Sequence, residues 1–244
     1  AADDSPTLPG EIVTWTSTAT DTLDVIRGGD QLQLLICKTN VGFDATVPTC
    51  GAGGAWATSS FTTQGNPSTS TEITIPTQDD DYDAYVYVYD NFGLEATGSW
   101  QGSSTVLRVS NAAPYVSTSS IGVYDVFGTT SSDTLLTLTE PEGLTQNFVV
   151  EFDVNDDNSC EAVGGGDEIG DADVNIYRSS IGGALGLGCD SALEFNVNNC
   201  YTHLATSSWW APNCYQVPGT CAGPEDVSVT WECTFPLWYV ADAT

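Results

Sequence analysis

A run of acidic side chains from Glu151 to Asp173 is the stretch whose residue types and spacing point most clearly to chemistry. It holds nine acids in 23 residues, with a glycine triplet at 164–166 near its centre. Carboxylates this close repel one another unless a hard cation neutralises them, and Ca²⁺ takes roughly six to eight such oxygen ligands. The segment therefore predicts a calcium site, and a solvated acidic loop is the alternative that the sequence leaves open.

The candidate calcium ligands begin with Asp153, Asn155 and Asp157, which have the one-three-five spacing of an oxygen-donor loop. The EF-hand pattern does not fit, because Asn158 stands at the sixth position, where that loop needs glycine. The full predicted ligand set is Asp153, Asn155, Asp156, Asp157, Asp171 and Asp173.

Side chains suited to catalysis are sparse. His203 is the one histidine, so a site with several histidines cannot form within one chain. The G-x-S-x-G, H-E-x-x-H and P-loop patterns do not occur in the sequence. Nothing in the sequence selects a pair for glycoside hydrolysis from the 33 acids. We therefore expect a protein that is not an enzyme.

Aromatic side chains suggest two further surfaces. Tyr85, Tyr87 and Tyr89 fall on one face of an alternating stretch, and Trp209 and Trp210 lie in a cysteine-rich region. Because aromatic residues are enriched at subunit interfaces, we expect both groups to make contacts between copies of the chain. Glycan binding by Trp209 and Trp210, through stacking on sugar rings, is the alternative.

The eight cysteines predict disulfides, because their number is even and no C-x-x-C pair occurs. They are Cys37, Cys50, Cys160, Cys189, Cys200, Cys214, Cys221 and Cys233. Cys37 and Cys50 are expected to pair, since they stand alone in the first half of the chain. The pairing of the other six stays open. Disulfides form in oxidising compartments, so we expect an extracellular or cell-surface protein.

These groups must be positioned by strands, and the clearest strand pattern lies between Ala84 and Pro114. Val86 and Val88 alternate with the three tyrosines, which predicts a strand whose valine face enters a core. A turn at 90–93 then leads to a second strand at Leu94–Trp100 and a third at Ser104–Ser110.

Further short strands with regular turn signals extend this pattern along the chain. They are predicted at Glu11–Ser17, Thr22–Val25, Gln31–Thr39, Ala55–Thr62, Thr71–Pro76, Tyr115–Val126, Thr134–Thr139, Gln146–Val154, Ala172–Arg178, Leu193–Val197 and Val227–Tyr239. We therefore predict an all-β protein of two tandem immunoglobulin-like β-sandwich domains, the second with a long disulfide-tied insertion. The predicted parts are an extended arm at 1–12, the domains 13–113 and 114–244, and an insertion at about 179–224.

The run YVYVYDNFGLEA, followed by VSNAAP, resembles the last strands of PKD-like and cadherin-like modules of bacterial and archaeal surface proteins. The resemblance covers about a third of the first module. The stretch from Asp153 to Asp156 is also similar to the cadherin calcium motif D-x-N-D-N, with Asp157 in place of the final Asn. The resemblance implies a module type, but no activity.

The net charge of −29 excludes several partners. Before Pro114 there are 14 acidic and 3 basic residues, and after Ala113 there are 19 acidic residues and 1 basic residue. Nucleic acid is therefore a poor partner, and no apolar run reaches the ~18 residues that a membrane span needs.

From these observations we expect a structural subunit that self-associates into an extracellular assembly, such as a surface filament, a pilus-like fibre or a surface layer. The arm at 1–12 is expected either to add a strand to a neighbouring subunit or to be a frayed terminus. A carbohydrate-binding or adhesive pair of surface modules is the alternative.

Overall fold

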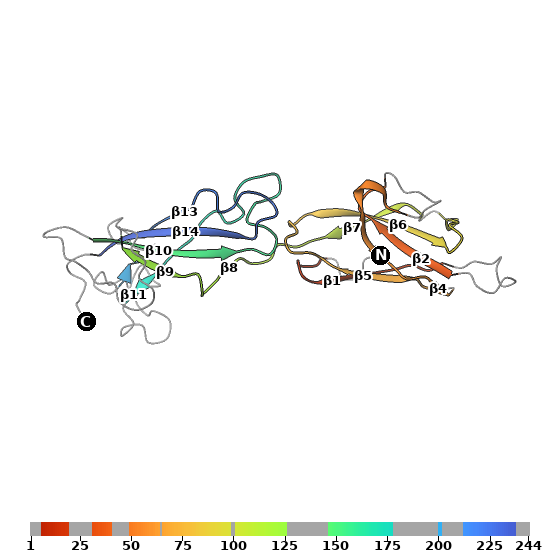
Figure 1. The fold of residues 1–244 in the computed structure, drawn as a ribbon, viewed down its shortest axis with the longest axis horizontal. Coiled ribbons are helices and arrows are strands. Elements are labelled where there is room, and N and C mark those ends of the chain that lie inside the picture. The colour runs from red at the N-terminus through yellow and green to blue at the C-terminus, as the bar shows by residue number, and fades with distance from the viewer. Residues whose placement is uncertain are drawn as a thin grey trace. The chain divides into compact units, whose positions relative to one another are not determined.

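The structure, a computed structural model, describes residues 6–19, 31–40, 49–63, 65–98, 101–125, 146–177, 200–201 and 212–237. The chain divides into two compact units, Ala1–Ala112 and Ala113–Thr244 (Figure 1). Regular structure in the described residues is β-strand, apart from one 3-10 turn at Gly51–Gly53, so the predicted all-β class is confirmed. The described residues contain no helix long and apolar enough to cross a membrane.

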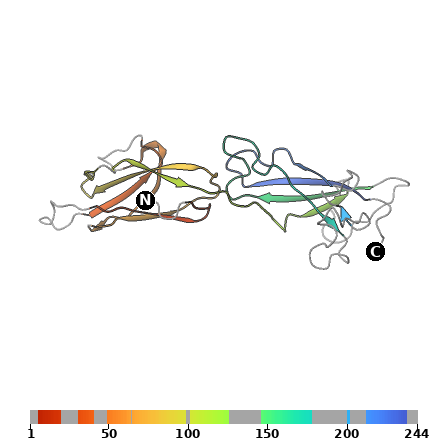
Figure 2. The same cartoon turned by 180° about the vertical axis from the view of Figure 1, so that it is seen from behind.

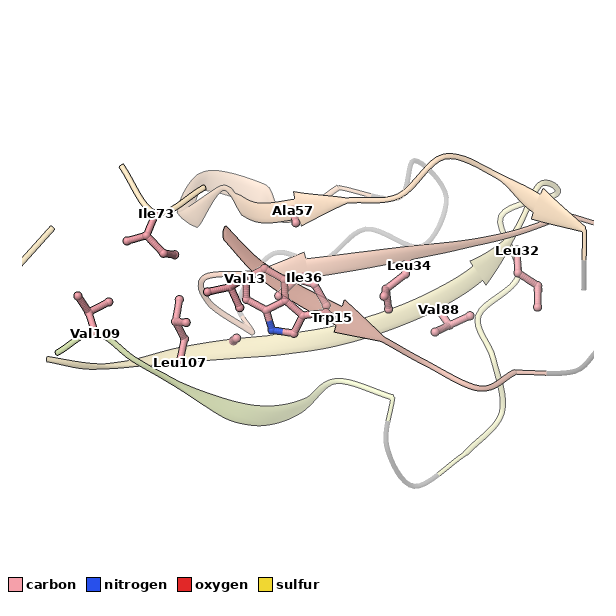
Figure 3. Close-up of a cluster of buried hydrophobic side chains, with 11 residues drawn as sticks. Val13, Trp15, Leu32, Leu34, Ile36, Ala57, Ile73, Val88, Leu107 and Val109 are labelled. Atoms are coloured by element: carbon pink, nitrogen blue, oxygen red, sulfur yellow. The ribbon is translucent and has the colours of Figure 1, made fainter. Parts of the chain in front are cut away.

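The first unit contains two antiparallel sheets. Its strands are β1 (Ile12–Thr16), β2 (Gln31–Cys37), β3 (Ala55–Thr58), β4 (Thr62–Thr63), β5 (Ser68–Glu72), β6 (Asp81–Asp90) and β7 (Ser103–Arg108). Strands β1 and β5 form one sheet, and the other has the order β3-β2-β6-β7, with β4 also paired to β2. Side chains from both sheets meet around Trp15, which is buried (Figure 3).

The β2–β6 pair is covered on both faces because successive side chains of a strand point in opposite directions. Leu34 and Ile36 of β2 face the main core together with Val88 of β6, so the valine face lies where the alternation predicted (Figure 3). On the opposite face, a second cluster gathers around the Cys37–Cys50 disulfide. Its buried members are Leu35, Cys37, Cys50, Tyr87 and Tyr89. Burial on both faces explains why β2 becomes continuously apolar towards its end.

The strand predicted at Leu94–Trp100 is wrong for its described residues, 94–98, which form a turn and a loop with a single bridge from Glu95 to Tyr89. The side chain of Gln101 takes the place of a pairing strand. Its Oε1 accepts a hydrogen bond from the backbone N–H of Val88, and its Nε2 donates to the carbonyl of Val88, both at 3.0 Å. A side-chain amide thus imitates a peptide group.

The N-terminal arm is docked on its own unit from residue 6 onwards. Thr7 is 2% exposed and forms a parallel bridge with Val109, just beyond β7. Its N–H donates to the carbonyl of Arg108, and its carbonyl accepts from the N–H of Ser110. The carboxylate of Glu11 accepts a further bond from the hydroxyl of Thr7, at 3.1 Å. The described part of the arm therefore pairs within the chain rather than extending freely towards a neighbour.

The second unit is built on one larger sheet. Its strands are β8 (Tyr115–Val116), β9 (Gly122–Asp125), β10 (Gln146–Asn155), β11 (Ile176–Tyr177), β12 (Cys200–Tyr201), β13 (Asn213–Gln216) and β14 (Ser228–Leu237). The order is β13-β14-β10-β8, β9 also pairs with β10, and β11 pairs with β12. The long strands β10 and β14 lie side by side (Figures 1 and 2). Their core face carries Phe148, Val150, Phe152, Val154, Val229, Trp231, Cys233 and Phe235.

Several predicted strands have different bounds in the structure. A turn at 117–120 divides the strand predicted at Tyr115–Val126 into β8 and β9. The strand predicted at Ala172–Arg178 is reduced to β11, and the one at Thr71–Pro76 starts earlier, as β5. The predicted strands at Thr22–Val25, Thr134–Thr139 and Leu193–Val197, and most of the insertion at 179–224, lie outside the described residues.

Replacing Gln101 by alanine is expected to lower the free energy of unfolding by about 1–3 kcal/mol, because the buried backbone groups of Val88 lose a partner. Ser104→Ala, at an exposed position of β7, is the control and should change it by less than about 0.5 kcal/mol. Urea unfolding followed by circular dichroism measures both variants. Equal stabilities would show that Gln101 does not hold β6.

Candidate functional site

The predicted calcium ligands at the end of β10 are engaged in local structure. Asp153 and Asn155 lie on an extended strand, so their backbones are about 7 Å apart and do not wrap around an ion as loop residues do. The carboxylate of Asp153 accepts a hydrogen bond from the hydroxyl of Thr230 on β14, at 2.8 Å. Asp156 is 1% exposed, and its Oδ1 accepts from the N–H of Asn158, which fixes the turn after β10.

The remaining candidates lie in less buried positions. Asp157 is half-buried in the same turn, whereas Asp171 and Asp173 are exposed in the segment that leads to β11. In the part of the chain that the structure describes, no three His, Cys, Asp or Glu side chains are grouped so that they would hold a metal ion. The structure therefore does not bring the predicted set together, and calcium binding stays a prediction.

The glycine triplet of the acidic segment forms the tip of a small hairpin. Gly164, Gly165 and Gly166 all have positive φ angles, between 90° and 110°, which residues with side chains rarely adopt. Below the tip, Glu161 lies opposite Asp167 in an antiparallel bridge. The glycines therefore turn the chain, and they also place two acids opposite each other.

A row of polar side chains on the outer face of the large sheet was not predicted from the sequence. Glu151 of β10 lies directly opposite Glu232 of β14, and Tyr215 of β13 lies opposite Glu232 on the other side. The phenol of Tyr215 donates to Glu232, and the phenol of Tyr124 on β9 donates to Oε1 of Glu151 at 3.4 Å. We call these four residues the Tyr–Glu–Glu–Tyr row. Only the strand register reveals it, because its members are far apart in the sequence.

Gly122 makes room for one end of this row. It lies opposite Glu151 in the ladder, and a Cβ atom added to it would lie 2.6 Å from the phenol oxygen of Tyr124. The ring of Tyr124 therefore lies across the glycine and reaches Glu151. A larger residue at position 122 would displace the ring.

The row is electrostatically unbalanced. Carboxylates directly opposite each other on paired strands repel, and the described residues of the second unit include no lysine or arginine. The carboxylates beside Tyr124 and Tyr215 raise the pKa of both phenols, mainly through charge at Tyr124 and through the hydrogen bond at Tyr215. Chemically, the row presents two carboxylates, each accepting a hydrogen bond from a phenol, and it favours positive charge nearby.

The tyrosine face of β6 differs from the expectation of an interface. Tyr87 and Tyr89 are only 7% and 5% exposed, because the segment around Cys50 covers them. The phenol of Tyr89 donates to Oε1 of Gln33, and burial raises the pKa of both tyrosines. Only Tyr85 is half-buried, with its phenol donating to Asp83 at 3.1 Å. Tyr87 and Tyr89 therefore belong to a second core and offer no contact surface.

The cysteines with described side chains form three disulfides. The predicted Cys37–Cys50 pair is confirmed. Cys160–Cys221 joins the turn after β10 to the loop before β14, and Cys214–Cys233 joins β13 to β14 at directly opposite positions. Cys189, Trp209 and Trp210 lie outside the described residues, and the side chain of Cys200 does too.

Comparison with known proteins adds no assignment to these features. No protein-family model matches the chain, and no curated protein matches it either. We therefore infer function from the placement of this chain's own residues.

Replacing Glu232 by glutamine should raise the free energy of unfolding by about 0.2–1 kcal/mol at low salt, because repulsion from Glu151 is removed while an acceptor for Tyr215 is kept. The gain should shrink in about 1 M NaCl, where charges are screened within about 3 Å. Glu225→Gln, at an exposed loop position, is the matched control for loss of one charge. A gain no larger than the control's, or one that salt leaves unchanged, would refute the repulsion.

Proposed function

We propose that this protein is a non-enzymatic structural subunit of an extracellular assembly, such as a filament, a pilus-like fibre or a surface layer. The observation that carries the proposal is the presence of two consecutive β units, each with its own core, the first with one disulfide and the second with at least two. A chain that consists of such units suits a repeated subunit of an assembly.

The fold of the first unit supports an immunoglobulin-like assignment. The five-stranded sheet, with the order β3-β2-β6-β7 and β4 also paired to β2, packs across a core from the β1–β5 pair. Trp15 and Val13 of β1 fill that core against Leu34 and Ile36 of β2 (Figure 3). Two antiparallel sheets that share an inner face define a sandwich, of which the immunoglobulin type is a common form.

The disulfides support the proposed extracellular location, because such bonds persist in oxidising environments. The charge is consistent with cation-rich surroundings, since opposed acids such as Glu151 and Glu232 repel less where cations screen them. We include calcium as a ligand of the acidic segment, with Asp153 as the residue to test first.

If calcium binds through Asp153, removing calcium with a chelator should lower the melting temperature of the wild-type protein, and Asp153→Ala should abolish that difference. Asp153 also accepts a hydrogen bond from Thr230, so Asp153→Ala costs stability even without calcium. Thr230→Val is therefore the control, because it removes the same hydrogen bond and keeps the carboxylate. Scanning calorimetry with and without chelator separates the effects. A wild-type melting temperature that stays the same when the chelator is added would rule out calcium binding.

Self-association is the direct test of the proposed function. We expect the purified chain to form regular polymers or sheets as its concentration rises, because a structural subunit must carry complementary surfaces. Sedimentation velocity over a concentration series, with and without calcium, measures association, and negative-stain microscopy shows its form. A monodisperse monomer at the highest concentration in calcium would contradict the proposal.

A further inference from the structure

We draw no further inference here: the strongest candidate, the apolar pocket on the core face of the large sheet of the second unit, between Val116, Ile121 and Phe235, is an unpartnered apolar face, and nothing in the structure shows what covers it.

Discussion

Burial on both faces of the β2–β6 pair is the constraint on which the first unit depends. The main core takes one face, and the disulfide-linked segment around Cys50 covers the other. Backbone amide hydrogens that are shielded on both sides exchange slowly with water, so we expect these strands to be the most stable part of the unit. At the end of β6, the buried carboxylate of Asp90 fixes the following turn by accepting hydrogen bonds from the N–H groups of Phe92 and Leu94.

The second unit differs from the first in its charge, because its acidic residues far outnumber its basic residues. The core face of β10 and β14 is continuous and apolar, whereas the outer face opposes Glu151 to Glu232. Disulfides at Cys160–Cys221 and Cys214–Cys233 offset such repulsion by restricting the unfolded chain, each typically by about 2–4 kcal/mol. The disulfides therefore stabilise the folded unit, whereas repulsion between its acids destabilises it. Because cations screen that repulsion, we expect the stability of the unit to depend on the cations around it.

Local patterns in the sequence predicted local structure well. The alternation of Val86 and Val88 with tyrosines correctly placed β6 and its core face, and the isolated pair Cys37 and Cys50 correctly predicted a disulfide. The burial of Tyr87 could not be predicted in the same way. Tyr87 shares a cluster with Cys50, 37 positions upstream, and its ring also lies against Gly102, 15 positions downstream; periodicity carries no information about such contacts.

The candidate site shows the same limit. The one-three-five spacing of acids suits a calcium loop, but Asp153 falls within β10, where alternate side chains spread along the strand. Conversely, Glu151 and Glu232 lie opposite each other through strand register although they are 81 positions apart in the sequence, so no sequence motif predicts this pair. Gln101 is a third case, because a side chain that pairs with the backbone of Val88 leaves no trace in hydropathy.

Electron cryomicroscopy of the concentrated, purified protein is the most direct test of the proposed function, since it would image both an assembly and its contacts. We expect a regular polymer or lattice in which each copy contributes both β units. Isolated monomers at the highest concentration would contradict the proposed function.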